Sequence, residues 1–351
     1  MKFKQIYLAA AISMAISGAA FAENSSATVS QTGDGNGATV SQLNVNDSIA
    51  NVSQTGTDNS STVSQTNSLN QMTAVVNTVG TNNTANITQD DSWFSTSTVN
   101  QDGSDNTANI TQIEISDVTT ATVNQLGTSS DNATINQTTA IASTALINQT
   151  NNFGPGNDAT INQTGVSNDA SITQNNTQGD VATIDQLGNN LTASIVQDDS
   201  WFSTATVNQS GNDNSASIDQ VAVSDFTSAS VTQSGEFQLA DVDQTTAIGS
   251  SVVVTQADSF NTALVSQGAN QSTVSVDQIG TEQYADVTQD GAFNDALISQ
   301  SGSLNEAYIT QSGVGASDAR NSATIMQSGA DDFASITQAG GGGNSALITQ
   351  N

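Results

Sequence analysis

Gln31-Thr-Gly-Asp-Gly-Asn36-Gly-Ala-Thr-Val-Ser-Gln42 contains the pattern that decides the fold. In this stretch a glutamine is followed after five residues by an asparagine, and then by Ala-x-Val-x-Gln. The second half, written Ala-x-Val/Ile-x-Gln, recurs 28 times along the chain at short and nearly constant intervals. The copies close on glutamine except at Thr78, and the residue two positions earlier is always Val or Ile. A short fixed period of this kind is typical of proteins that stack one structural unit many times.

The repeat predicts a β-strand with one inward face. If the closing glutamine is position 0, Ala at −4 and Val or Ile at −2 share its face, because side chains alternate along a strand. Positions −3 and −1 carry mostly Thr, Ser, Asn and Asp, which we therefore expect to point into solvent. An asparagine at −6 belongs to the inward face in twelve copies: Asn36, Asn59, Asn83, Asn106, Asn157, Asn168, Asn214, Asn261, Asn294, Asn305, Asn321 and Asn344.

Short arcs and longer arcs alternate between the early strands, so two strands and two kinds of corner make one turn, as between Gln31 and Gln54. The predicted fold is all-β: a β-solenoid of about 14 two-strand turns, with two parallel sheets around an interior of Ala, Val, Ile, Gln and Asn. Inward amides would hydrogen-bond to their copies one turn away, which satisfies these buried polar groups. We predict that such structural ladders include Gln31, Asn36, Gln42, Gln54, Asn59, Gln65, Gln101, Asn106, Gln112, Gln163, Asn168, Gln174, Gln209, Asn214, Gln220, Asn305, Gln311, Asn344 and Gln350.

The regular pattern has two irregularities. The segment around Trp93 and Phe94 recurs around Trp201 and Phe202, nine strands later. Nine is odd, so the copies belong to opposite sheets, and we expect the alternation of corners to slip near Pro155, the only proline. The longest interval runs from Gln311 to Gln327, and it predicts a protruding arc.

Residues 1–22 are predicted to be a secretory signal peptide. Lys2 and Lys4 precede an apolar run, and Ala20-Phe21-Ala22 fits a small-x-small cleavage site. The run is short for a membrane-spanning helix, and no later segment is apolar enough to span a membrane. Residues 23–351 are predicted to form a single repeat array, with no membrane span in the mature form.

The charge of the chain excludes one class of partner and its residue types exclude several kinds of chemistry. The net charge is −30, with 33 acidic residues, and Arg320 is the only basic residue beyond the predicted signal peptide. Such acidity argues against binding nucleic acid. The chain has no His and no Cys, so it offers no catalytic set, no disulfide and no site for a cofactor. Asp219 and Asp243 would lie on adjacent turns, where we favour a role as charged gatekeepers over a shared cation.

The spacing Gln-x4-Asn-x5-Gln resembles the repeat of the curlins, the amyloid subunits of bacterial curli fibres. Gln31/Asn36/Gln42, Gln54/Asn59/Gln65, Gln101/Asn106/Gln112, Gln163/Asn168/Gln174 and Gln209/Asn214/Gln220 match it fully. Gly341-Gly-Gly-Asn344-Ser-Ala-Leu-Ile-Thr-Gln350 and Asp318-Ala-Arg-Asn-Ser322 are also similar to curlin phrases. The resemblance implies an extracellular subunit at the bacterial cell surface that polymerises end to end as biofilm matrix. Its implied partners are further copies of itself, a secretion pore and a nucleator.

Three alternatives remain at this stage. The polar composition is also found in disordered chains, but 28 in-phase branched residues favour a packed fold. An ice-binding solenoid would need a flat face of Thr-x-Thr ladders, whereas the outward pairs here are mixed. A monomeric surface adhesin is the stronger rival. Against it, a repeat adjoins each end of the predicted mature chain, so we expect the terminal strands to recruit other copies.

Overall fold

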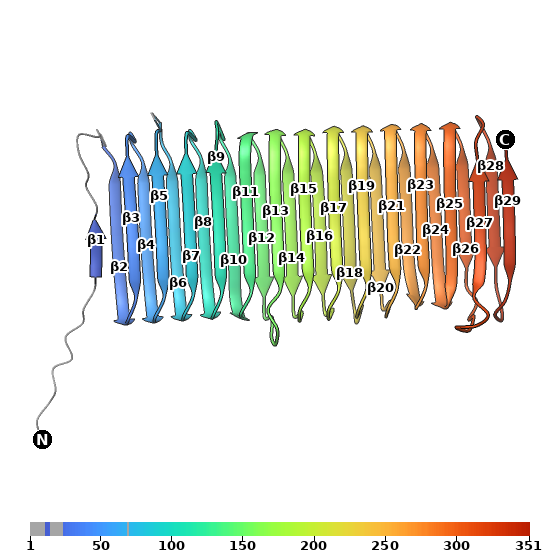
Figure 1. Cartoon of the computed structure of the whole chain (residues 1–351), viewed down its shortest axis with the longest axis horizontal. Helices are drawn as coiled ribbons and strands as arrows, with labels where there is room; N and C mark the ends of the chain where they lie inside the picture. Colours follow the sequence, from blue (N-terminus) through green and yellow to red (C-terminus); the bar gives the residue numbers. More distant parts are fainter. Residues whose placement is uncertain (1–10, 15–23, 69) are drawn as a thin grey trace, which may run out of the picture. The chain divides into compact units, whose positions relative to one another are not determined.

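The computed structural model describes residues 11–14, 24–68 and 70–351, and these residues form 29 β-strands and no helix (Figure 1). Most of the predicted signal peptide therefore lies outside the described residues. Its one described element is β1 (Ala11–Met14), which pairs in parallel with β3. None of the described residues belongs to a helix that could cross a membrane. The chain divides into two compact units, residues 1–165 and 166–351.

In the first unit, successive strands alternate between two parallel sheets, so that one even-numbered and one odd-numbered strand make a turn. Each strand pairs in register with the strand two positions later in the chain; Val52 in β4, for example, faces Val76 in β6. The even sheet contains β2 (Ser26–Asp34), β4 (Ile49–Thr57), β6 (Thr73–Thr81), β8 (Thr96–Ser104), β10 (Thr120–Ser129) and β12 (Thr144–Thr150). The odd sheet contains β3 (Gly37–Leu43), β5 (Ser60–Thr66), β7 (Thr84–Asp90), β9 (Thr107–Ile113), β11 (Asn132–Ile141) and β13 (Asp158–Val166).

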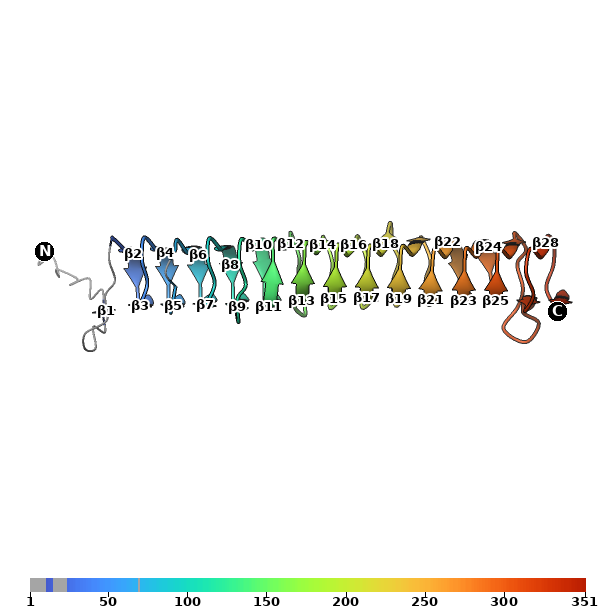
Figure 2. The same cartoon turned by 90° about the horizontal axis from the view of Figure 1, so that it is seen from above.

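The second unit is built in the same way. Its even strands are β14 (Asp169–Asn175), β16 (Thr192–Asp198), β18 (Ser215–Val221), β20 (Leu239–Thr245), β22 (Thr262–Asn270), β24 (Tyr284–Ala292), β26 (Glu306–Gln311) and β28 (Phe333–Gln338). Its odd strands are β15 (Val181–Asn189), β17 (Thr204–Asn212), β19 (Ser228–Glu236), β21 (Ser251–Ser259), β23 (Thr273–Thr281), β25 (Asn294–Ser303), β27 (Asn321–Gln327) and β29 (Ser345–Gln350). The strands of the two sheets form two facing rows (Figure 2). The predicted all-β solenoid of about 14 two-strand turns is therefore confirmed.

The interior is a thin layer of small and branched side chains. Ala170 and Ile172 in β14 are buried, with exposed fractions of 1% and 0%, whereas Thr173 between Ile172 and Gln174 is half-buried on the outer face. The same alternation runs through the other interior strands, as the period of two predicts. Each buried branched side chain contributes about 2 kcal/mol of hydrophobic free energy, so the repeat packing holds a chain without disulfides together.

The corners exchange their places between the two units. In the first unit, tight two-residue corners follow even strands, as at 35–36 and 58–59. In the second unit most of them follow odd strands, as at 167–168 and 190–191, although 271–272 follows the even strand β22. The change occurs at β11, which has two-residue corners on both sides, at 130–131 and 142–143. The arc 151–157, which contains Pro155, is the first long corner after an even strand and follows this change, so the slip lies before Pro155. As a result, the Trp93 segment precedes even strand β8 whereas its copy at Trp201 precedes odd strand β17.

Candidate functional site: amide ladders and edge strands

Glutamine side chains at position 0 form hydrogen-bonded ladders inside each unit. In the first unit, Gln42 Nε2 donates to Gln65 Oε1 at 2.8 Å. In the second unit, Gln174 donates to Gln197 and Gln197 donates to Gln220, both at 2.9 Å. The direction is the same in every described glutamine pair: the amide nitrogen of the earlier residue donates to the oxygen of the later one. Each ladder is therefore a one-way chain of donors and acceptors.

The second amide hydrogen fixes this direction. Gln101 Nε2 also donates to the backbone oxygen of Thr84 on the opposite sheet, at 2.9 Å. Gln209 Nε2 donates in the same way to the Thr192 oxygen, at 3.0 Å. A flipped amide would place its oxygen against these carbonyl oxygens, which can only accept. Each hydrogen bond to the opposite sheet therefore fixes the amide orientation of the glutamine that donates it.

Asparagine at −6 forms a second ladder that runs the opposite way. The Asn59 backbone N–H and Nδ2 both donate to Asn36 Oδ1 at 3.0 Å, so the later residue donates to the earlier one. Asn59 Nδ2 also donates to the Gly80 oxygen at 2.9 Å. In the second unit, Leu191 N–H donates to Asn168 Oδ1 at 3.1 Å. Asparagine thus binds the tight corner of one turn to the corner of the next.

Glycine two residues after the closing glutamine allows the corners to stack closely. Gly33 and Gly56 have φ values of +114° and +125°. A Cβ atom on Gly33 would lie 1.9 Å from the Gly56 oxygen, and one on Gly211 would lie 2.0 Å from the Gly235 oxygen. Sequence reasoning missed this contact, although the repeated Gln-x-Gly spacing was visible.

The residues proposed for the ladders all lie at inward positions. Gln31, Gln42 and Gln350 are half-buried and Asn344 is exposed, because they belong to or adjoin edge strands, and the other members are buried. Thr78 interrupts one ladder of the first unit. There Gln54 Nε2 donates to Ser61 Oγ at 2.8 Å instead of to a glutamine.

Two buried carboxyl groups take the place of asparagine at −6, and sequence reasoning missed them. Asp131 accepts a hydrogen bond from the Asn157 N–H at 2.8 Å. Asp180 accepts hydrogen bonds from the Ser203 N–H at 2.8 Å and from Ser200 Oγ at 2.5 Å. Burial raises the pKa of Asp131, and it raises the pKa of Asp180 to about 7, because the hydrogen bonds only partly offset the cost of desolvation. An Asp where the repeat has Asn was the available signal.

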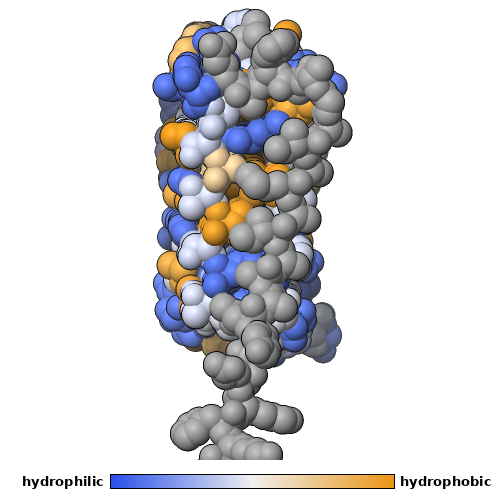
Figure 3. Space-filling model, turned by 90° about the vertical axis from the view of Figure 1, so that its left-hand side faces the viewer, coloured by the Kyte–Doolittle hydropathy of each residue, from blue (hydrophilic) through white to orange (hydrophobic). Residues whose placement is uncertain are grey.

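The N-terminal edge, which we call the head, consists of β2 and β3. Ala27 and Val29 in β2 are half-buried, although their counterparts in interior strands are buried. Gln31 Oε1 is buried and accepts no hydrogen bond from the described residues. The space-filling view from this side shows hydrophobic side chains among hydrophilic ones (Figure 3).

The C-terminal edge, which we call the tail, consists of β28 and β29. Ala346 and Ile348 in β29 are half-buried. Gln350 Nε2 donates to the Phe333 oxygen at 3.1 Å but to no further glutamine. Asp332 Oδ2, at the −6 position of β28, is buried and has no hydrogen-bond partner among the described residues.

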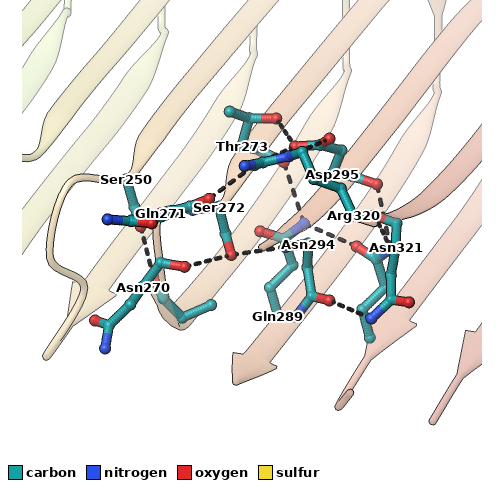
Figure 4. Close-up of polar contacts among 12 residues, drawn as sticks. Ser250, Asn270, Gln271, Ser272, Thr273, Gln289, Asn294, Asp295, Arg320 and Asn321 are labelled. Carbon is teal, nitrogen blue, oxygen red and sulfur yellow. Dashed lines mark hydrogen bonds and ion pairs between the residues drawn. The ribbon is translucent and has the colours of Figure 1, made fainter. Parts of the chain in front are cut away.

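A guanidinium clasp holds the long arc between β26 and β27 (Figure 4). Arg320 Nε and Nη2 each donate to an Asp295 carboxylate oxygen at 2.6 Å, and Nη2 also donates to the Gln271 oxygen at 2.7 Å. Thr273 Oγ1 donates to Asp295 at 2.6 Å. Burial would raise the pKa of Asp295, but the hydrogen bonds and the charge of Arg320 outweigh it, so this pKa lies below its usual value. The arc protrudes, as expected, but it is anchored.

The outer face of the even sheet in the second unit is acidic. Asp219 in β18 faces Asp243 in β20 in register, and Asp241 lies two residues earlier in β20. Burial and then the charges of Asp241 and Asp243 raise the pKa of Asp219. Within the described part of the chain, no three His, Cys, Asp or Glu side chains are grouped in a way that could hold a metal ion.

Aromatic side chains are exposed at the duplicated corners. Trp93 and Phe94 have exposed fractions of 41% and 54%, and Trp201 and Phe202 have 44% and 45%. Phe202 stacks on Phe226 of the next turn, with ring centroids 5.5 Å apart. At this copy, the corner residues therefore pack locally while still presenting apolar surface.

Comparison with known proteins finds one similar repeat family. A search of curated proteins found no match to the chain. The model of the curlin-associated repeat matches three segments, residues 22–56, 280–313 and 319–351. These segments include both edges and follow the ladder spacing described above. The chain therefore contains curlin-associated repeats at both of its edges and before the last turns, and in these segments it is similar to the curlins.

Proposed function

We propose that this chain is a secreted structural subunit that polymerises end to end into extracellular, curli-like amyloid fibres, which serve in biofilm matrix and adhesion. The observation that carries the proposal is the one-way direction of the glutamine ladders. A one-way ladder leaves unused acceptors at one edge and unused donors at the other. A second copy of the same chain offers the matching set.

The glutamine donors at the tail match the glutamine acceptors at the head. Gln31 Oε1 at the head lacks the donor that an interior glutamine receives. Gln338 and Gln350 at the tail donate to backbone oxygens but have no later glutamine to reach. If β28 and β29 of one copy stack on β2 and β3 of the next, Gln338 can donate a hydrogen bond to Gln31, and Gln350 can donate one to Gln42. Only the head-to-tail orientation pairs donors with acceptors.

The asparagine ladder supports the same orientation. Asn344 Nδ2 donates to Asn321 at 3.1 Å, while Asn344 Oδ1 accepts no hydrogen bond from the described residues. In interior turns such an oxygen accepts the N–H of the following −6 residue, which in a next copy is Asn36. Asp332 Oδ2 would accept from the corner at Ser25 of that copy. A carboxylate oxygen left buried and unpaired is costly, so this contact favours association.

β1 covers part of the head in the full chain. Ala11–Met14 pair in parallel with Gly37–Val40 of β3, where a preceding turn would lie. Cleavage after residue 22 would uncover this edge. We therefore expect the mature chain, and not the precursor, to be competent for assembly at both ends.

The central test uses one charge at each edge. Val29→Asp places a charge on the inward face of the head, and Ile348→Asp places one on the inward face of the tail. We expect each variant alone to stay monomeric in electron micrographs, because the charge would be buried at the junction. An equimolar mixture should form dimers and stop, since only one intact head meets one intact tail. Thr28→Asp and Thr349→Asp, on the outer face, are the matched controls and should still form fibres.

The wild-type mature chain should form thin fibres with a cross-β spacing of about 4.7–4.8 Å along the axis. Because the chain carries a net charge of −30, added salt should speed growth by screening repulsion between copies. A chain that stays monomeric at high concentration, with salt, would contradict the fibre proposal. Adhesion to surfaces by that monomer would then support the monomeric adhesin, for which the exposed Trp93 and Trp201 corners are the candidate contacts.

A further inference from the structure

Two tyrosines stand side by side on the outer face of the even sheet in the second unit. Tyr284 belongs to β24 and Tyr308 to β26, and these two strands are hydrogen-bonded neighbours. Their ring centroids are 5.5 Å apart with an interplanar angle of 39°. Both side chains are half-buried, so reagents in solution can reach them. The pair lies away from the ladders and has no part in the proposed stacking.

Two carboxylates complete the cluster. The strand register places Tyr284 opposite Glu306 and Tyr308 opposite Asp286, so the tyrosines occupy one diagonal and the acids the other. Tyr308 Oη donates to Glu306 Oε2 at 3.4 Å. Burial, followed by these carboxylates, raises the pKa of both phenols, so each phenol keeps its proton at neutral pH. A phenol that is hydrogen-bonded to a carboxylate can release its proton as it loses an electron.

We propose that Tyr284 and Tyr308 form an oxidative cross-linking site, at which peroxide and a peroxidase join them into an intramolecular dityrosine. Each phenol loses one electron to the oxidant and one proton, which passes to Glu306 from Tyr308 and to solvent from Tyr284. The two phenoxyl radicals then form one carbon–carbon bond between their ortho carbons. The two ortho hydrogens move to the phenolic oxygens, so both phenols are restored. One hydrogen peroxide accepts the two electrons and two protons and becomes two waters.

Several features favour coupling within one molecule. The rings are held on adjacent strands, so the second radical is already next to the first and the reaction gains from proximity. Rotation of exposed side chains is fast enough to bring the ortho carbons together. The neighbouring ring, Phe333, lies 5.6 Å from Tyr308 but has no phenol and cannot couple in this way. In a chain without cysteine, the product would be a covalent link between two turns.

The test treats the full chain, carrying Tyr7→Phe so that only these two tyrosines remain, with peroxidase and hydrogen peroxide at low protein concentration. Digestion after acidic residues and mass spectrometry should show one cross-linked peptide pair, lighter than its two components by two hydrogens. Its yield should not depend on protein concentration. Tyr284→Phe and Tyr308→Phe should each abolish it, and unfolding the chain in urea before oxidation should lower the yield at least tenfold.

Two results would overturn the proposal. One is the absence of the bridge under conditions that couple a free tyrosine peptide. The other is dityrosine that rises with protein concentration and joins separate molecules only. Because the pair takes no part in the proposed end-to-end stacking, either result leaves the fibre proposal unaffected.

Discussion

The interior strand β14 and the edge strand β29 carry nearly the same inward side chains and differ in what covers them. Ile172 in β14 is fully buried, whereas Ile348, at the same position of β29, is half-buried. The strands that flank β14 make this difference, because each inward row packs on the rows above and below it. A complete strand in this fold is therefore only partly stabilised until the next turn is added.

The largest effect is expected from a charge in the interior. Ile172→Asp would bury an unpaired carboxylate, and we expect it to lower the free energy of unfolding by more than about 4 kcal/mol. Thr173→Asp, at the next and outward position, should change it by less than about 1 kcal/mol. Urea titration followed by circular dichroism measures both. Similar losses for the two variants would show that the inward and outward faces are assigned wrongly.

The next largest effect on the free energy of unfolding is expected at the buried carboxyl group of Asp180, and it depends on pH. The pKa of Asp180 is about 7 in the folded chain against an ordinary value of 3.8, so the folded state binds this proton more tightly. Its contribution to stability is complete below pH 3.8 and is lost as the pH rises to about 7. Asp180→Asn has no proton to lose, and its advantage over the wild type should therefore grow by up to about 4 kcal/mol between these values.

Urea titrations at pH 4, 6 and 8 would measure the Asp180→Asn advantage. Asp34→Asn, at an exposed position, controls for the loss of one negative charge. An Asp180→Asn advantage that is the same at all three pH values would remove Asp180 as the source of the dependence.

Breaking one ladder rung should cost less. Gln197→Leu leaves Gln174 without its acceptor and Gln220 without its donor, so we expect a loss of about 1–3 kcal/mol and slower fibre growth. Ser194→Leu, on the outer face of the same strand, is the matched control. Thermal unfolding and the elongation rate of seeded fibres would be compared. If the two leucine variants grow at the same rate, the amide ladders are not needed for stacking.

The smallest effect on the free energy of unfolding is expected at the ion pair between Arg320 and Asp295. Arg320→Ala removes three charged hydrogen bonds, but the ion pair is about one-third exposed, so we expect a loss of only about 1 kcal/mol. A double-mutant cycle with Asp295→Asn isolates the pair. A coupling energy near zero would mean that the arc 312–320 is held by its backbone contacts alone.

Periodicity was sufficient to predict the fold, since an alternation of period two inside a short, repeated two-strand turn leaves few other arrangements. It also indicated which amide side chains point inward, because side chains alternate along a strand. The direction of the ladders was not predictable, since it depends on the second amide hydrogen and its carbonyl on the opposite sheet. Arg320 and Asp295 are 25 residues apart, and Arg320 has no counterpart in the other turns, so no pattern joined them. Asp180 was missed because burial, and not residue type, gives it an unusual pKa.

The duplicated segments at Trp93 and Trp201 show how such a chain can lengthen. They lead into strands of opposite sheets, because nine strands separate them. In most two-sheet proteins, duplicating an odd number of strands would prevent correct packing, because residues suited to one sheet would be placed in the other. Here both sheets use the same inward residues, so a copied segment fits either one once a single corner has changed length. Genetic duplication can therefore extend this protein by an odd number of strands, so a whole number of two-strand turns is not required.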